Sequence, residues 1–172
     1  MRHIIAMLLQ NEAGALARVA GMFSARGYNI ESLTVAATHD PEISRLTMVT
    51  IGDDNVIAQI IKQSRKSIDV IEIADLTSRS HLESELLVVK VAATESGAAA
   101  IARFTELNYG VILDETGNTR TLQFTGRGSH IGAVLTELAA MTTILELARS
   151  GTAALERGES VLAPADLTTL PY

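Results

Sequence analysis

A short turn near the N-terminus has the residue types that can hold a carboxylate. Asn11–Leu16 joins a strand-like run to a helical pattern, so the backbone N–H groups of Gly14–Leu16 are expected at the start of a helix. Such groups lack intrahelical partners and, together with the helix dipole, attract negative charge. Small residues at Ala13–Ala15 allow close approach to the backbone, and the Asn11 amide can both donate and accept hydrogen bonds. From these residues alone, an ordinary turn and helix cap is the alternative.

A second turn, Gly126–Gly132, also lies between a strand-like run and a helical pattern, where phosphate loops occur. It departs from G-x-G-x-x-G by one residue and has no P-loop lysine. A tight turn in which Ser129 caps the helix explains the same residues. The phosphate interpretation would make the chain a small enzyme acting on a phosphorylated substrate.

Other catalytic or metal-binding groups are scarce. The chain has no cysteine, which excludes disulfides and thiolate chemistry. Its four histidines show no pair at metal-ligand spacing, and we expect them to be surface or turn residues: His3, His39, His81 and His130. We therefore predict no catalytic residue and no metal site.

Composition limits the partners and the location. A net charge of −6 disfavours nucleic acid, which attracts clustered positive charge. The one basic group, Lys62, Arg65 and Lys66, has the spacing of a solvated helix face. No signal peptide and no membrane-spanning run is expected, so we predict a cytoplasmic protein that does not enter a membrane.

The elements that must position these turns alternate between two periodicities. In the first half, strands are predicted over residues 3–9, 28–37, 43–51 and 68–76. One helix is predicted over 14–26, with Gly27 ending it in a left-handed conformation. Asp53 or Asp54 can cap a second helix. The predicted order is βαββαβ.

The same plan recurs in the second half, with strands over 86–93, 111–115, 119–124 and 143–149 and helices over 97–107 and around 131–138. The turn Asn11–Ala15 has its counterpart in Thr94–Ala98, and Gly27 has one in Gly110 at the same offset. We therefore predict an α/β (α+β) protein of two tandem ferredoxin-like modules. The predicted domains are 1–77, a linker 78–82, a second module 83–155 and a flexible tail 156–172.

The first predicted strand is apolar on both of its faces. Two helices of a βαββαβ unit cover only one face of its sheet. We therefore expect the second face to be covered by the other module or by another subunit, which favours an oligomer.

Two runs, Leu8–Val19 and Phe23–Val35, resemble the ACT domain that opens the small, regulatory subunit of acetolactate synthase (acetohydroxyacid synthase). Ser44–Thr47, Asp69-Val70 and Ala148–Gly151 fit the same family. The likeness covers roughly residues 1–155. The run from Arg26 to Val35 is typical of this subunit rather than of ACT domains at large.

The resemblance implies a non-catalytic chain that pairs with a large catalytic subunit. That subunit condenses pyruvate with thiamine diphosphate, and the small subunit raises its activity and confers feedback inhibition by valine in branched-chain amino acid (valine and isoleucine) biosynthesis. Thiamine diphosphate, Mg and FAD are expected in the catalytic subunit, and no cofactor in this chain.

The resemblance further implies a homodimer through the ACT domains, with valine as the effector between them. The effector residues it assigns are Asn11, Ala13, Gly14, Ala15 and Leu16 of one chain and Asn29 and Ile30 of its neighbour. Ala13 stands where serine is common in the family. Two other functions are open: a free-standing ACT amino-acid sensor, and the small ferredoxin-like enzyme acting on a phosphorylated substrate.

Overall fold

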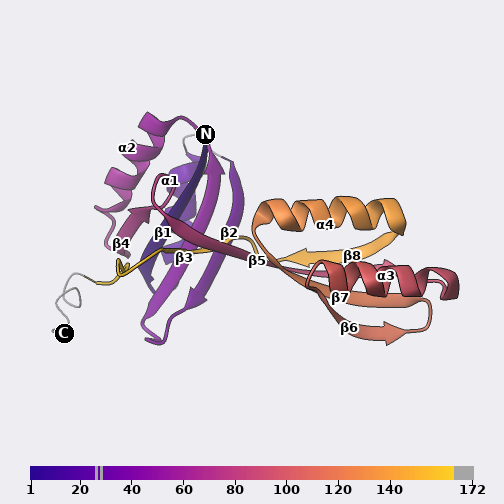
Figure 1. Cartoon of the computed structure of the whole chain (residues 1–172). Coiled ribbons are helices and arrows are strands. Elements are labelled where there is room, and N and C mark those ends of the chain that lie inside the picture. The colour runs from indigo at the N-terminus through magenta and orange to yellow at the C-terminus, as the bar shows by residue number, and fades with distance from the viewer. Residues whose placement is uncertain (26, 28, 165–172) are drawn as a thin grey trace. The chain divides into compact units, whose positions relative to one another are not determined.

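The structure, a computed structural model, describes residues 1–25, 27 and 29–164. The chain divides into unit 1, which is Met1–Leu82 together with the residues from Thr152 onward, and unit 2, which is Glu83–Gly151. Each unit has an antiparallel sheet with two helices (Figure 1), so the predicted fold class is confirmed. The predicted domain boundaries stay predictions, and residues 165–172 of the predicted tail lie outside the described residues.

Unit 1 begins with the predicted βαββαβ order. Its elements are β1 (Arg2–Gln10), α1 (Ala15–Ser24), β2 (Ile30–Ala37), β3 (Ile43–Ile51), α2 (Asp54–Ser64) and β4 (Val70–Asp75). The strands lie in the order β2-β3-β1-β4. The Asp53 carboxylate accepts from the Asn55 N–H at 2.9 Å and caps α2, and Gly27 has a φ of +73°, so both predicted helix signals are confirmed.

The core of unit 1 lies between its sheet and its two helices. Residues 3–9 of β1 are all buried, and Ile5, Met7 and Leu9 face the helices. The large side chains buried there include Phe23, on the apolar stripe of α1, and Ile60, on the apolar stripe of α2. Burial of each such side chain contributes about 1.5 to 3 kcal/mol to the stability of the fold. These contacts hold the two helices on the sheet.

The second face of this sheet is covered by the chain's own C-terminal segment, residues 152–164. This segment contains β9 (Ala153–Glu156), and Figure 1 shows it crossing the sheet on the side away from α1 and α2. Ala154 is buried against Ile4 and Val49, and Leu162 packs on the same cluster. Ala154 lies within the residues predicted as the second module, 83–155, whereas Leu162 lies in the predicted tail, which the sequence pattern did not assign to this face. No periodicity marked these residues, so the sequence pattern did not reveal them.

Unit 2 repeats the arrangement. Its elements are β5 (His81–Ala92), α3 (Glu95–Leu107), β6 (Val111–Thr116), β7 (Thr119–Gly126), α4 (Gly128–Met141) and β8 (Ile144–Arg149), with strands in the order β6-β7-β5-β8. Gly110 is needed for close approach, because an added Cβ would lie 2.5 Å from the Phe124 ring. The left-handed conformation after α3 belongs to Tyr109, with a φ of +56°, and not to Gly110.

Candidate functional site

The turn between β1 and α1 presents an uncapped helix N-terminus at the surface of unit 1. Gly14 is the N-cap residue, has a φ of +87°, and no side chain caps the helix. The first i to i−4 bond runs from the Arg18 N–H to the Gly14 carbonyl at 3.0 Å. The Ala15 N–H donates to the Glu12 carbonyl at 3.2 Å, so the expectation that it is unpaired is wrong. The N–H groups of Leu16 and Ala17 point out of the first turn, where they can donate to an anion.

Asn11 connects this turn by hydrogen bonds to the β2–β3 loop and to the start of β3. Its Nδ2 donates to the Pro41 carbonyl at 2.8 Å, and its Oδ1 accepts from the Ser44 hydroxyl at 2.9 Å. Its backbone N–H donates to the Glu42 carbonyl at 2.7 Å. A ligand that contacts the Asn11 amide must share or replace these bonds, so Asn11 also sets the position of the turn.

Arg18 and Asp69 form an ion pair beside the same turn, which the sequence analysis did not assign. Arg18 Nε and Nη2 donate to the two carboxylate oxygens of Asp69 at 2.5 and 2.6 Å. This hydrogen bonding from Arg18 holds the pKa of the buried Asp69 below its ordinary value, against the opposing effect of burial, and raises the pKa of Arg18. The fork-to-fork geometry fixes the guanidinium in one orientation.

The third nitrogen of that guanidinium lies over Gly14. A Cβ added at Gly14 would be 2.8 Å from Arg18 Nη1, which takes no part in the pair with Asp69. An oriented cation therefore lies beside the N-cap residue of α1, and both a cation and a helix N-terminus favour a carboxylate. One signal could have found Arg18: a cation near a helix N-terminus opposes the helix dipole and calls for a local anion.

The predicted effector residues fall into two groups at opposite ends of the sheet. Gln10 of β1 pairs with Ile43, whereas Ile30 of β2 pairs with Thr50, which pairs with His3. At about 3.4 Å per residue, the length of β1 between those rows is roughly 24 Å. Within one chain, Asn29 and Ile30 are therefore not brought together with the Asn11–Leu16 turn.

The turn's own residues differ in exposure. Asn11, Ala13, Gly14 and Leu16 are exposed, whereas Ala15, the first residue of α1, is buried. A surface cavity of about 550 Å³ borders Asn11 and Glu12 but includes none of Ala13–Leu16. The feature of this turn that suits a carboxylate is therefore the open helix N-terminus and not this cavity.

The glycine-containing turn 126–132 lies beside an ion pair of the chain's own residues. Arg149 Nε and Nη2 donate to the buried Glu85 carboxylate at 2.5 and 3.0 Å. Glu85 Oε2 lies 3.4 Å from where a Cβ of Gly128 would be, at the start of α4. A phosphate there would face this carboxylate. The prediction that Ser129 caps the helix is wrong, because the N-cap residue is Arg127.

The histidines and acidic residues offer no alternative site. In residues 1–25, 27 and 29–164, no group of three or more His, Asp or Glu side chains could hold a metal ion. His3 is buried in β1 with its Nε2 3.2 Å from Asp54 Oδ1, so the expectation of a surface position is wrong for it. Within the same described part of the chain, none of the helices is long and apolar enough to cross a membrane.

Comparison with known proteins identifies relatives over nearly the whole chain. The family profile "AHAS small subunit-like ACT domain" matches residues 5–72, and the profile "Small subunit of acetolactate synthase" matches residues 84–158. The small subunit of acetolactate synthase isozyme 3 from Salmonella typhimurium is 45% identical over 162 residues, which are 94% of this chain and 99% of that protein. Its counterpart from Escherichia coli K12 is 44% identical, with the same coverage of both chains.

A solved structure gives the same result. The crystal structure of the acetolactate synthase small subunit from Thermotoga maritima is similar with a TM-score of 0.83 at 31% identity, and the match covers 93% of this chain and 99% of that one. Sequence and fold therefore agree across both units.

Proposed function

Because the chain belongs to the family of acetolactate synthase small subunits and carries that family's ACT domain, we propose that it activates a catalytic large subunit and makes it sensitive to valine. Membership in this family implies the large subunit as partner. The chain itself performs no catalytic step and holds no cofactor in this proposal. Thiamine diphosphate, Mg and FAD belong to the large subunit.

The observation that carries the effector site is the charge arrangement at Gly14. Arg18 Nη1 lies beside Gly14, the N-cap residue of the helix whose first-turn N–H groups face solvent. The carboxylate of a free amino acid is a group that such donors bind. Asp69 keeps Arg18 in place before a ligand arrives, which lowers the ordering cost of binding.

A second copy of the chain completes the site in this proposal. One amino acid cannot span the roughly 24 Å that separates the two groups of effector residues in one chain. Asn29 and Ile30 must therefore come from a neighbour if they contact the same ligand. Ile30 belongs to β2, an edge strand whose outer side another chain can reach.

Valine then acts by linking two chains. A ligand bound by both copies favours the arrangement in which both halves of the site meet. If the large subunit is more active with the other arrangement, valine inhibits it, with a coupling of about 1 to 3 kcal/mol typical of allosteric pairs.

The other two functions make different predictions. A free-standing sensor would bind valine without changing acetolactate formation. An enzyme for a phosphorylated substrate would use the turn 126–132, where the Glu85 carboxylate beside Gly128 is paired with Arg149.

The deciding experiment measures acetolactate formation by this chain alone, by its large subunit alone and by the mixture, each with the three cofactors and increasing valine. We expect no product from the chain alone, higher turnover in the mixture and inhibition by valine only in the mixture. Product from the chain alone, or a mixture that responds neither to the chain nor to valine, would refute the proposal.

A further inference from the structure

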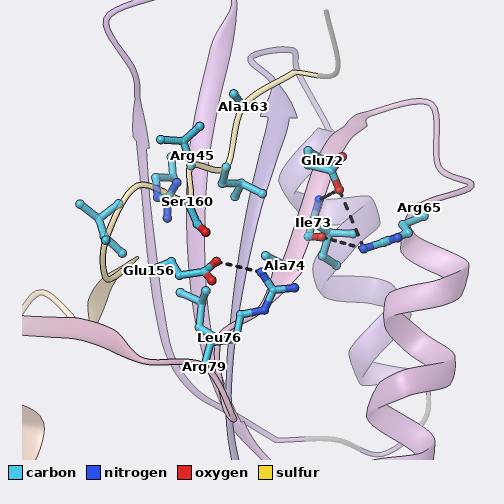
Figure 2. A pocket seen from close by; sticks show the side chains of 14 residues that line it. Arg45, Arg65, Glu72, Ile73, Ala74, Leu76, Arg79, Glu156, Ser160 and Ala163 are labelled. Atoms are coloured by element: carbon cyan, nitrogen blue, oxygen red, sulfur yellow. Dashed lines mark hydrogen bonds and ion pairs between the residues drawn. The ribbon is translucent and has the colours of Figure 1, made fainter. Parts of the chain in front are cut away.

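Unit 1 contains a second candidate site, on the sheet face opposite α1 and α2. A cavity of about 540 Å³ lies between β4, the end of α2 and the C-terminal segment (Figure 2). Ligand pockets commonly have volumes of about 300 to 1,000 Å³. The sequence pattern predicted no binding site in this region, and the predicted effector residues lie elsewhere.

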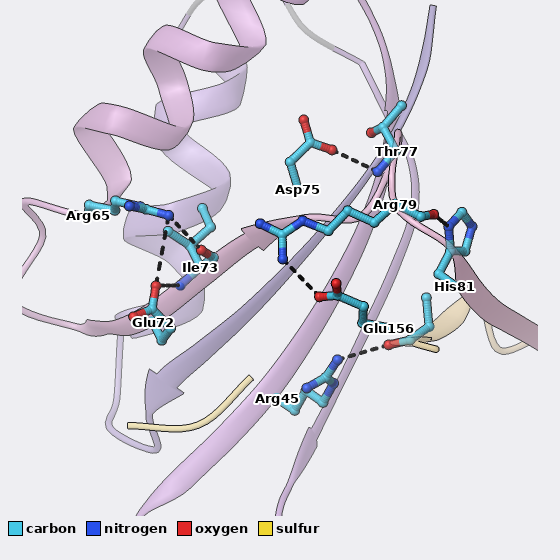
Figure 3. Close-up of polar contacts among 10 residues, drawn as sticks. Arg45, Arg65, Glu72, Ile73, Asp75, Thr77, Arg79, His81 and Glu156 are labelled. Atoms are coloured by element: carbon cyan, nitrogen blue, oxygen red, sulfur yellow. Dashed lines mark hydrogen bonds and ion pairs between the residues drawn. The ribbon is translucent and has the colours of Figure 1, made fainter. Parts of the chain in front are cut away.

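Arg45 brings a cation to this cavity without a matching carboxylate. It lies on β3, is half-buried, and its Nη2 donates to the Ala154 carbonyl at 2.9 Å (Figure 3). Within the described part of the chain, no carboxylate lies within 4.0 Å of its guanidinium nitrogens, unlike Arg18, Arg79 and Arg149. Burial lowers the pKa of Arg45, and no acidic neighbour offsets that effect.

Two further arginines line the cavity, each already engaged. Arg79 Nη1 donates to Glu156 Oε2 at 2.8 Å, so this pair joins the chain after β4 to the C-terminal segment (Figure 2). Arg65 Nη2 donates to the Ile73 carbonyl at 3.1 Å and lies 4.0 Å from Glu72 Oε1 (Figure 3). Three arginines therefore face two glutamates, and the surplus positive charge is that of Arg45.

The rest of the lining is mainly apolar. Ala74 and Leu76 form the sheet side and are buried. Val161 and Leu162 lie on the side of the C-terminal segment. The cavity thus combines one cation in need of a partner with a hydrophobic wall, which suits a small molecule that has an anionic head and an apolar body.

We propose that this cavity binds a small organic acid whose carboxylate or phosphate pairs with Arg45 and whose apolar part packs against Leu76 and Leu162. Because one wall is the C-terminal segment, the ligand would hold that segment on the sheet. Glu156 competes with the ligand for the positive charge of Arg79, so the site is tuned by a carboxylate of the chain itself. The inference does not depend on the valine site.

The test is a calorimetric titration of the full chain at constant ionic strength with acetate, butanoate, hexanoate and inorganic phosphate. We expect saturable binding that tightens from acetate to hexanoate if the head is a carboxylate. Tighter binding of phosphate than of acetate would identify a phosphate head instead. Absence of saturation with all four probes would overturn the proposal.

Three variants locate the site. Arg45→Met should weaken binding by at least about tenfold, as expected for loss of a hydrogen bond to a charged group. Glu156→Gln should tighten it several-fold, because Arg79 loses its competing carboxylate. Arg103→Met, which removes an arginine from α3 of unit 2, is the matched control and should change nothing.

Arg45→Met and Glu156→Gln are expected to change the binding affinity in opposite directions. The test therefore stays decisive if Arg45→Met also loosens the C-terminal segment. General disruption of the segment would weaken binding in the Glu156 variant as well, since that variant breaks a contact of the same segment. Weaker or unchanged binding in Glu156→Gln, or unchanged binding in Arg45→Met, would overturn the proposal.

Discussion

Replacing Gly14 with aspartate tests whether the N-terminus of α1 receives the carboxylate of an effector. The substitution has two separable effects. A residue with a side chain in the left-handed region costs about 1 to 3 kcal/mol of backbone strain, which Gly14→Ala shares. Only aspartate adds charge. Its Cβ would lie 2.8 Å from Arg18 Nη1, so its carboxylate can form the ion pair with Arg18 that we assign to the ligand.

The expected loss of affinity follows from the geometry. Two carboxylates about 4 Å apart repel each other by about 4 kcal/mol at an effective dielectric of about 20. That energy corresponds to roughly a thousandfold in the dissociation constant. Gly14→Ala shares both the backbone strain and the contact of its Cβ with Arg18 Nη1, so it should lower the free energy of unfolding and measures the loss of affinity that occurs without an added charge.

The assay is a valine titration of acetolactate formation by the large subunit reconstituted with each chain, beside urea unfolding of each chain alone. Both variants should still activate the large subunit. Gly14→Asp should raise the half-inhibitory valine concentration by at least about a hundredfold relative to Gly14→Ala, because only aspartate adds the charge. Unchanged valine sensitivity in Gly14→Asp would refute the site, and equal loss in both variants would refute the charge argument.

Three stability predictions follow from other contacts. The pKa of Asp69 is held below its ordinary value. The ion pair with Arg18 therefore stabilises the fold above the unfolded-state pKa of about 3.9, and this stabilisation is lost as the pH falls through the folded-state pKa. Urea midpoints between pH 6 and pH 3 should consequently fall less steeply in Asp69→Asn than in the unmodified chain. Gly110→Ala should lower the free energy of unfolding by about 1 to 3 kcal/mol through overpacking, whereas Gly132→Ala, with nothing within 4 Å, should be neutral or stabilise α4 by up to about 1 kcal/mol. Ala154→Leu should destabilise unit 1 by about 1 to 3 kcal/mol through overpacking against Ile4 and Val49, and Leu155→Ala, at an exposed neighbour, should not; thermal melts measure both pairs.

The sequence predicted the order of the elements because each element buries one stripe or face. Ile57 and Ile60 lie on the apolar stripe of α2, and the Asp53 cap marks where that helix begins. Residues 43–51 were predicted at the bounds that β3 has. Local signals of this kind need no knowledge of what lies across the sheet.

Contacts between distant segments were not predictable in this way. Arg18 and Asp69 are far apart in sequence, and only the pairing of β1 with β4 brings the start of α1 next to that carboxylate. Arg65 was predicted to lie on a solvated helix face, yet it reaches the Ile73 carbonyl at the edge of the arginine-lined cavity. The C-terminal segment is short and aperiodic, so its place on the sheet depends on that sheet being formed first.

The covered second face changes what a second copy of the chain must do. An apolar face left open would favour coverage by another subunit stacked on it, one of the two possibilities that the sequence pattern predicts. Ala154 and Leu162 now occupy part of that face, so stacking would have to displace the chain's own C-terminal segment. The separation of Ile30 from the Asn11–Leu16 turn along the sheet is a different argument for a second copy. It favours contact at the edge of the sheet, where β2 keeps its outer backbone groups available for another chain.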